Sequence, residues 1–292
     1  MKKMLAAFIV ILLIALVILT LWLPSFIMNA KRQTYEEAFQ WQTEHYDTSF
    51  YEGLEKTDYT VTSYDGYVLH AEFLKNPVPS TEYVIITHGY TDNMMGALKY
   101  ATLYLDLGFN CVIYDLRGHG KNEPTFTTYG IREADDLLSI ISDTRERYTD
   151  ITILGLAGES LGSAATVTCL KYKPDVDFAV ADCGFSDIEN VLKGQAPDFL
   201  IDLADIGARI RYHYSLEAMR PIDSLDDNEI PILFIHGADD TLIPPKNSGD
   251  MAARTKGRSE FRTIPGAEHA VAIITDPEMY RGYVESFLDS LK

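Results

Sequence analysis

The sequence of 292 residues contains few basic residues for its length. Its 25 lysines and arginines stand against 43 aspartates and glutamates, which leaves a formal net charge of −18 at pH 7. Proteins that bind nucleic acid use lysine and arginine to contact the phosphate backbone. The charge balance therefore argues against a nucleic-acid partner. A large net negative charge also favours solubility, and this effect alone can account for it.

Cysteine is also scarce, with three residues in the whole chain. Cys111 and Cys183 lie in or beside apolar, strand-like runs, and Cys169 lies in a segment that we expect to be helical. An odd number of scattered cysteines argues against a disulfide framework, and we interpret all three as small buried apolar residues. No cluster of histidine, cysteine or acidic residues has the spacing of a metal site, so we expect neither a metal nor another cofactor.

The sequence does contain one long apolar run over residues 4–23, in which Thr20 is the only polar residue. About 20 apolar residues suffice to cross a bilayer. A cleaved signal peptide usually has a shorter apolar core and small residues before the cut, and Met28-Asn29-Ala30 is a poor cleavage site. We therefore predict an uncleaved transmembrane signal anchor within residues 1–30, with a cleaved signal peptide as the alternative.

The charges that flank this run indicate its orientation. Lys2, Lys3 and the α-amino group precede it, whereas Lys31 and Arg32 follow it and are themselves followed by two glutamates. The slight excess of positive charge on the N-terminal side favours an N-terminus inside the cell. We expect a single-pass protein of the cell membrane, with the rest of the chain on the extracellular side.

Residues 31–56 form a connector with helical periodicity, and a folded domain is expected over residues 57–292. Apolar and polar residues alternate over residues 57–63 and again over residues 67–74, and Asp65-Gly66 between them is a hairpin signal. The sequence thus predicts an antiparallel hairpin at the start of the domain.

Short apolar strands alternate with helices after the hairpin. The expected strands are residues 83–87, 110–114, 151–156, 178–181, 231–235 and 260–264, and the expected helices are residues 94–107, 131–148, 163–172 and 276–291. Buried strands joined by helices are typical of a parallel sheet with helices on both faces. We therefore predict an α/β fold with a mostly parallel, doubly wound sheet that opens with an antiparallel hairpin.

The alternation stops at about residues 185–230, where the pattern becomes helical. This segment is too long for a plain connection, and we predict that it forms a helical cap over the C-terminal edge of the sheet. Its apolar side chains, including those of Phe199, Ile206 and Tyr212, would form a large exposed patch if they all faced water. We therefore expect some of them to line a substrate pocket.

A candidate nucleophile lies in the G-x-S-x-G pattern of residues 158–162. An apolar strand precedes this pattern and a helix rich in small residues follows it, which is the context of a nucleophile elbow. The turn holds Ser160 in a strained conformation with its Oγ exposed, and a Cβ at Gly158 or Gly162 would clash with the neighbouring strand or helix. We predict that Ser160 is the nucleophile.

A serine nucleophile needs a histidine base that a carboxylate orients. In sheets of this type the acid follows the serine, and the histidine follows the acid. His269 lies in a small-residue loop after the last strand and is the only histidine beyond the candidate acids. Asp239 and Asp240 compete after the strand at residues 231–235; spacing favours Asp240, and Asp182 remains a further alternative.

The oxyanion of a tetrahedral intermediate needs two backbone N–H donors. We expect one from Leu161, directly after the nucleophile, and the other from Tyr90 in the loop after the strand at residues 83–87. The Tyr90 side chain is a candidate for shaping the acyl pocket. Four further polar residues are expected to have local structural roles. The loop histidines should form hydrogen bonds to the backbone; they are His88, His119 and His236. The Glu159 carboxylate should pair with a neighbouring residue.

These motifs resemble those of the α/β-hydrolase superfamily, from about residue 57 to the C-terminus. They are H-G-Y at residues 88–90, D-L-R-G-H-G at 115–120, G-E-S-L-G at 158–162, H-G-A-D-D-T-L-I-P at 236–244 and G-A-E-H at 266–269. With its apolar N-terminal run, the chain resembles membrane-anchored bacterial serine hydrolases of the esterase, lysophospholipase-like and serine aminopeptidase-like branch. The family pattern H-G-x-x-D-x-x-[VI]-P falls on Asp240. Asn122 stands where the family often has serine, which concerns loop packing rather than catalysis.

The resemblance and the residues together predict a serine hydrolase that needs no cofactor. We expect a carboxylesterase that cleaves small to medium acyl esters through a Ser-His-Asp triad and an acyl-enzyme. One alternative is an aminopeptidase-like serine peptidase of the same fold, which would need an acidic residue in the cap to bind a peptide α-amino group. The other is a catalytically silent, membrane-anchored binding domain. The expected partners are thus a small ester or peptide-like substrate and the membrane.

Overall fold

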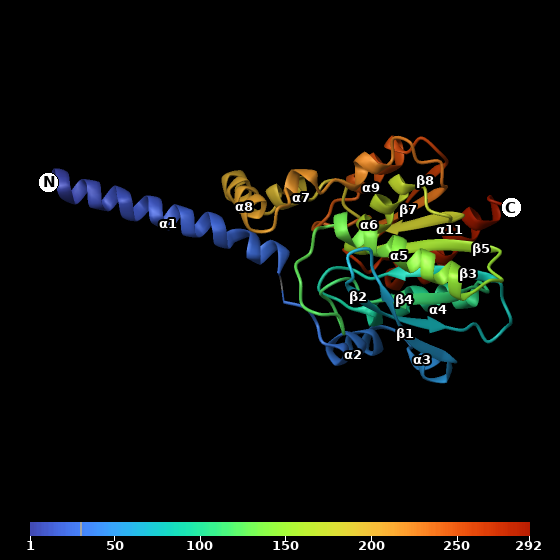
Figure 1. The fold of residues 1–292 in the computed structure, drawn as a ribbon. Coiled ribbons are helices and arrows are strands. Elements are labelled where there is room, and N and C mark those ends of the chain that lie inside the picture. The colour runs from blue at the N-terminus through green and yellow to red at the C-terminus, as the bar shows by residue number, and fades with distance from the viewer. Residues whose placement is uncertain (30) are drawn as a thin grey trace.

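The fold is built on one eight-stranded sheet with the strand order β1-β2-β4-β3-β5-β6-β7-β8 (Figure 1). The computed structural model describes residues 1–29 and 31–292; Ala30, the last residue of the predicted anchor, lies outside the described residues. The strands are β1 (Lys56–Thr62), β2 (Val68–Leu74), β3 (Glu82–Thr87), β4 (Asn110–Tyr114), β5 (Ile153–Glu159), β6 (Phe178–Asp182), β7 (Ile232–Gly237) and β8 (Ser259–Ile264).

The sheet opens antiparallel and continues parallel. Strand β2 pairs antiparallel with β1 and with β4, whereas all neighbours from β4 to β8 pair parallel. The predicted α/β sheet with its antiparallel opening hairpin is confirmed. Because parallel strands end at the same edge, the loops that follow β3, β5, β6, β7 and β8 gather there.

Helices cover both faces of the sheet, and alternate side chains of each central strand enter opposite cores. Ile85 belongs to the core under α5, α6 and α9, and its neighbours Val84 and Ile86 belong to the core under α4, α10 and α11. The helices are α4 (Leu98–Asp106), preceded by the 3₁₀ turn η1 (Met94–Ala97), α5 (Ile131–Arg147), α6 (Leu161–Cys169), followed by the 3₁₀ turn η2 (Leu170–Tyr172), α9 (Lys246–Arg254), α10 (Ala272–Thr275) and α11 (Pro277–Asp289).

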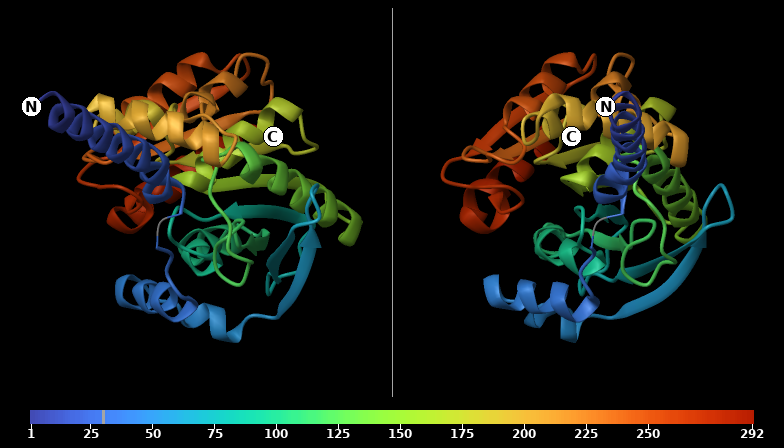
Figure 2. Two further views of the ribbon diagram at one scale, coloured as in Figure 1. Left: turned by 60° about the vertical axis from the view of Figure 1, so that its left-hand side comes forward. Right: turned by 90° about the vertical axis from the view of Figure 1, so that its left-hand side faces the viewer.

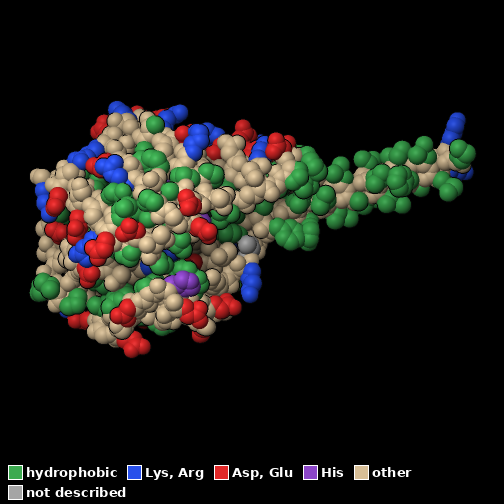
Figure 3. Space-filling model, turned by 180° about the vertical axis from the view of Figure 1, so that it is seen from behind, with side chains coloured by type: hydrophobic (Ala, Val, Ile, Leu, Met, Phe, Trp, Pro, Cys, Tyr) green, Lys and Arg blue, Asp and Glu red, His purple; other side chains and the backbone are tan. Residues whose placement is uncertain are grey.

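The first helix, α1 (Lys2–Met28), projects from the body, and apolar side chains cover it (Figures 1 and 3). Its length and composition fit a membrane anchor or a signal sequence. Its last turn differs from the rest, because Met28 is fully buried in the core of the body. The Ile27 carbonyl accepts hydrogen bonds from the Tyr90 hydroxyl at 2.6 Å and from the Tyr129 hydroxyl at 2.5 Å. The end of α1 is thus an integral part of the folded body.

The expected helical connector contains α2 (Tyr35–His45) and α3 (Ser49–Gly53). A capping box begins α2: the Glu37 N–H donates to the Thr34 hydroxyl at 3.1 Å, and the Thr34 N–H donates to the Glu37 carboxylate at 2.8 Å. Ala38 of this helix is fully buried in the core that α4 covers. The connector therefore packs against the layer of helices that covers this face of the sheet.

The segment between β6 and β7 is helical, with α7 (Ile188–Lys193), α8 (Asp198–Arg211) and the 3₁₀ turns η3 (Leu216–Ala218) and η4 (Pro221–Ser224). Helix α8 lies beside the body-side end of α1 in both views of Figure 2. Phe199 and Ile206 on α8 are 62% and 48% exposed. Phe199 and Ile206 are therefore not among the side chains of this segment that could line a substrate pocket, because they face away from the body.

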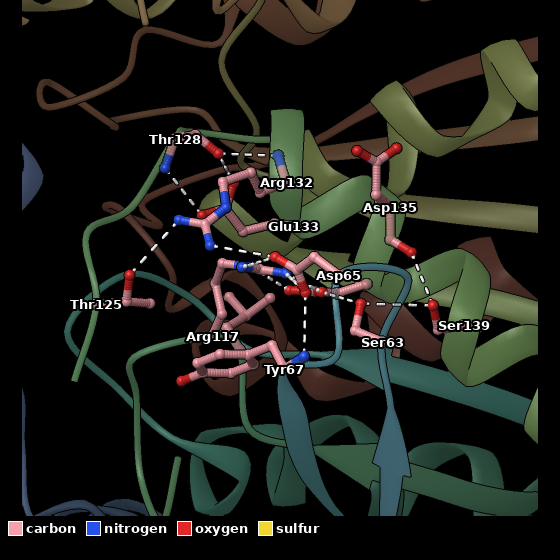
Figure 4. Close-up of polar contacts among 12 residues, drawn as sticks. Ser63, Asp65, Tyr67, Arg117, Thr125, Thr128, Arg132, Glu133, Asp135 and Ser139 are labelled. Carbon is pink, nitrogen blue, oxygen red and sulfur yellow. Dashed lines mark hydrogen bonds and ion pairs between the residues drawn. The ribbon is translucent and has the colours of Figure 1, made fainter. Parts of the chain in front are cut away.

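A buried ion pair holds the loop after β4 (Figure 4). The Arg117 side chain is fully buried, and its Nε donates to Asp136 Oδ2 on α5 at 2.6 Å. Its Nη1 also contacts Asp65 in the β1–β2 turn at 3.1 Å. The arginine of the D-L-R-G-H-G motif thus joins three elements. Removing one partner would leave a buried charge unpaired, which is strongly destabilising.

Candidate active site

The turn between β5 and α6 holds Ser160 in a strained conformation. Its φ is 52° and its ψ is −111°, a region that residues other than glycine rarely adopt. A Cβ on Gly158 would lie 2.3 Å from the Gly162 carbonyl oxygen, and a Cβ on Gly162 would lie 2.1 Å from the Thr87 carbonyl oxygen. The predicted steric reason for both glycines therefore holds, since backbone atoms leave no room for a side chain.

His269 lies between Ser160 and Asp240. Its Nε2 is 3.0 Å from Ser160 Oγ, and its Nδ1 is 2.7 Å from Asp240 Oδ2. Asp240 follows β7 and His269 follows β8, so two loops at the same sheet edge bring them to the serine. A carboxylate can only accept, so Nδ1–H donates to Asp240 and Nε2 is free to accept the serine proton. This arrangement can deprotonate the Ser160 hydroxyl.

Asp240 is buried and receives several hydrogen bonds. Its Oδ1 accepts the backbone N–H groups of Leu242 and Ile243 at 3.0 and 2.8 Å, and its Oδ2 accepts His236 Nε2 at 3.1 Å as well as His269. Burial alone would raise the pKa of the Asp240 carboxyl, but the hydrogen bonds from the two histidines hold this pKa below its usual range. Asp240 is therefore an anion that can stabilise a protonated His269.

The other candidate acids lie elsewhere. Asp239 is exposed. Asp182, at the end of β6, accepts a hydrogen bond from the Tyr100 hydroxyl at 2.8 Å, and burial raises its pKa to about 6. The structure thus joins Asp240, the residue favoured by spacing, to His269.

The loop after β3 lies directly against the nucleophile. A Cβ on Gly89 would come within 3.6 Å of the Ser160 Cβ, so the backbone of this loop passes next to the serine. Leu161 is the first residue of α6, where the backbone N–H has no partner within the helix. The Tyr90 side chain points to α1, because its hydroxyl donates to the Ile27 carbonyl. The Leu161 and Tyr90 N–H groups remain candidates for an oxyanion hole.

The remaining motif histidines have mostly local roles. His88 accepts the Leu116 N–H at 3.0 Å and lies 2.7 Å from the Gly89 carbonyl, and His119 Nδ1 lies 2.9 Å from the Arg117 carbonyl. These two bond backbone as expected. His236 does more, because it contacts Asp240 and also lies 2.7 Å from the Ser248 hydroxyl. It holds the same carboxylate oxygen of Asp240 that His269 contacts, and the sequence did not predict this role.

The sequence also did not predict a buried cation beside the nucleophile. Lys99 on α4 forms an ion pair with Glu159, the residue before Ser160, and each side chain is 5% exposed. The Lys99 ammonium also donates to the carbonyl of Ala270, the residue after His269, at 2.8 Å. Lys99 thus links the end of β5, which precedes Ser160, to the loop after β8 that carries His269. Glu159 pairs with a neighbour, as predicted.

We expect Lys99→Met to lower turnover by about 10²-fold, the scale of a displacement of about 1 Å between reacting groups. The loss should fall on kcat rather than on KM, since Lys99 positions residues that flank the site. The Lys99→Met/Glu159→Gln double variant removes both charges and should recover the melting temperature lost in the single variant. Equal kcat in Lys99→Met and the wild-type protein would contradict this role; exposed Lys75→Met is the control.

Within residues 1–29 and 31–292, no group of three or more histidine, cysteine or acidic side chains is placed to hold a metal ion.

The chain is similar in sequence to known proteins. Residues 96–285 match the prolyl oligopeptidase family. The chain is 31% identical over 306 residues to the uncharacterized protein YqkD of Bacillus subtilis, covering all of this chain and 98% of that protein. It is 25% identical over 238 residues to the uncharacterized protein YfhR of Escherichia coli K12, covering 78% of each chain.

Solved structures share the fold at low sequence identity. The esterase Pf2001 of Pyrococcus furiosus superposes with a TM-score of 0.69 at 21% identity, covering 84% of this chain and 94% of that one. Est1E of Butyrivibrio proteoclasticus, solved with ferulic acid bound, superposes with a TM-score of 0.64 at 19% identity, covering 78% of this chain and 99% of that one. Both likenesses concern the α/β-hydrolase fold.

Proposed function

Because the chain belongs to the prolyl oligopeptidase family and is an α/β serine hydrolase, we propose that it is a carboxylesterase for small to medium acyl esters. The observation that carries the proposal is the chain of hydrogen bonds from Ser160 through His269 to Asp240. A strained serine, a neutral imidazole and a buried anion in this order are what an acyl transfer to serine requires.

In the proposed mechanism, Ser160 Oγ attacks the ester carbonyl as His269 Nε2 takes the hydroxyl proton. Asp240 holds the imidazole and stabilises its positive charge. The N–H groups of Leu161 and Tyr90 bind the oxyanion of the tetrahedral intermediate. His269 then returns the proton to the leaving alcohol, which departs and leaves an acyl-enzyme. Water, deprotonated by the same histidine, releases the acid and restores Ser160.

The charges of the helical insert favour an esterase over an aminopeptidase. A site for a peptide α-amino group needs an available carboxylate, and most acids of the insert already have a basic partner within it. These pairs are Asp187 and Asp223 with Arg220, Glu189 and Asp202 with Lys193, and Asp205 and Glu217 with Arg209. Binding an ammonium group at any of these six acids would require breaking such a pair.

A panel of p-nitrophenyl esters of increasing acyl length, run beside the anilide of the same acyl group, tests the proposal. We expect higher kcat/KM on esters than on the matched anilide. Higher activity on an aminoacyl anilide with a free α-amino group would instead make the protein a peptidase. Failure to react with a fluorophosphonate probe or with any ester would support the silent binding domain.

We also propose that α1 is an uncleaved membrane anchor. Residues 27 and 28 would be lost with a signal peptide cut near residue 30, yet Met28 is buried in the core and its carbonyl accepts the Thr127 N–H at 3.0 Å. Removing them would also remove the Ile27 carbonyl, which accepts hydrogen bonds from the Tyr90 and Tyr129 hydroxyls. The intact mass of the protein purified from membranes should therefore include residues 1–30, and a mass that begins near residue 31 would refute this.

The flanking charges favour a catalytic domain on the extracellular side. We expect protease added to intact cells to digest the domain, because the slight excess of positive charge before the apolar run of residues 4–23 retains the N-terminus inside. An epitope tag placed before Met1 should resist the same treatment. Protection of the domain until the cells are lysed would reverse the assigned orientation.

A further inference from the structure

Helix α8 carries an apolar stripe that the body does not cover. Phe199, Leu203, Ile206 and Ile210 fall on one side of the helix, since they are separated by three, four or seven residues. Phe199 is 62%, Ile206 48% and Ile210 58% exposed. The opposite side of α8 is buried on the body through Ile201, Ala204 and Ala208. The stripe therefore faces away from the folded core.

Successive turns of α8 run along the last turns of α1. A Cβ on Gly207 would lie 1.9 Å from the Thr20 carbonyl oxygen, so the two helix backbones touch there. One turn later, Arg211 Nη1 donates to the Leu21 carbonyl at 2.7 Å. The Asn29 side-chain amide then donates to the Tyr212 hydroxyl at 2.5 Å. This contact fixes the position of the stripe relative to α1.

The contact lies at the boundary of the apolar run of α1. Twenty residues of helix, from residue 4 to residue 23, span about 30 Å, the thickness of the hydrocarbon core. Thr20 and Leu21 are therefore at the outer edge of that core if α1 crosses a bilayer. Trp22 and Phe26, which are exposed and pack on each other, lie at the level where aromatic side chains gather in membrane proteins.

We propose that the α8 stripe docks on the lipid bilayer beside α1, so that the helical insert rests in the membrane interface. The proposal rests on α1 being the anchor proposed above. The body end of α1 contacts Tyr90 and Tyr129, and the Tyr90 loop adjoins Ser160. Docking thus holds the site close to the membrane surface, where amphiphilic acyl esters reside. The net charge of −18 favours zwitterionic over anionic lipid as the surface.

Quenching by brominated phosphatidylcholine tests the docking. The full chain has two tryptophans, Trp22 and Trp41. Phe199→Trp and Ile206→Trp are made separately in a Trp22→Phe/Trp41→Phe background and placed in nanodiscs, one chain per disc. Both introduced tryptophans should lose fluorescence when brominated lipid replaces ordinary lipid. The matched control is Val78→Trp, an exposed apolar position in the β2–β3 loop, at the sheet edge opposite Ser160, which should not be quenched.

The outcomes separate the docking from the proposals on which it depends. Trp41→Phe alone leaves Trp22 as the reporter of the anchor, and absence of quenching there would refute the anchor itself. Quenched Trp22 with unquenched tryptophans at positions 199 and 206 would overturn the docking and leave the anchor standing. Equal quenching of the Val78→Trp control would overturn it too, because contact would then be unspecific. None of these readings depends on esterase activity, so a failure of the enzymatic proposal is detected separately.

The stripe should also matter for delivery of substrate. Phe199→Ser/Ile206→Ser/Ile210→Ser alters exposed side chains only, so turnover of a short soluble ester should stay at the wild-type level. Turnover of a long-chain ester embedded in phosphatidylcholine vesicles should fall, because binding to the interface scales with the apolar area inserted. An unchanged ratio of the two rates would contradict a role of the stripe in substrate access.

Discussion

Ser160→Ala is expected to lower ester turnover by about 10⁶-fold, the loss found when the nucleophile of a serine hydrolase is removed. Alanine has no hydroxyl to attack the carbonyl, and the acyl-enzyme cannot form. The oxyanion donors and the substrate site stay in place, so residual turnover of about 10³-fold over water is expected. Ester hydrolysis and labelling by a fluorophosphonate probe measure the two consequences, and labelling should be absent.

A variant of a second serine controls for damage to the turn and to the helix that follows it. Ser163 lies on α6 one turn after Ser160 and is fully buried. Ser163→Ala should keep probe labelling and most of the turnover, since this hydroxyl has no part in the proposed reaction. If Ser160→Ala still labels, or if Ser163→Ala loses labelling while its melting temperature is unchanged, the nucleophile has been assigned to the wrong residue.

The sheet was predictable because each of its strands is a local signal. Runs such as residues 83–87 and 110–114 are short, apolar and bounded by turn residues, and the predicted strand boundaries differ from those in the structure by at most three residues. The positions of Ser160, Asp240 and His269 were also predictable. Each follows a strand that can be recognised locally, and parallel strands end at one edge.

Contacts between distant segments were not predictable in the same way. Nothing in the residues around Lys99 indicates that its ammonium meets Glu159, 60 positions later in the chain, because helical periodicity places it only on a face of α4. The burial of Met28 and the packing of α8 on α1 likewise depend on tertiary structure. For this reason some apolar side chains of residues 185–230 were expected to line a pocket, whereas the structure places Phe199 and Ile206 on an outer surface.

Asp240→Asn is expected to lower turnover by about 10⁴-fold, the scale of losing a triad acid while the geometry is kept. An amide can donate a hydrogen bond to His269 Nδ1, which would move the imidazole proton to Nε2. Nε2 could then no longer accept the Ser160 proton. The amide also lacks the negative charge that stabilises a protonated His269. Steady-state kinetics should show the loss in kcat.

Two comparisons separate this effect from damage to the loop. The asparagine side chain keeps one oxygen for the N–H groups of Leu242 and Ile243, which now bond Asp240 Oδ1, so the melting temperature should change far less than the rate. Asp239→Asn makes the same replacement of a carboxylate by an amide at the exposed neighbouring residue. It should leave turnover within a few-fold of wild type. A larger loss in Asp239→Asn than in Asp240→Asn would reverse the assignment. If Asp240→Asn instead lowers the melting temperature strongly along with kcat, Asp240 is a structural residue. A residue that acts only by holding the loop can lower kcat only if its loss also loosens the loop.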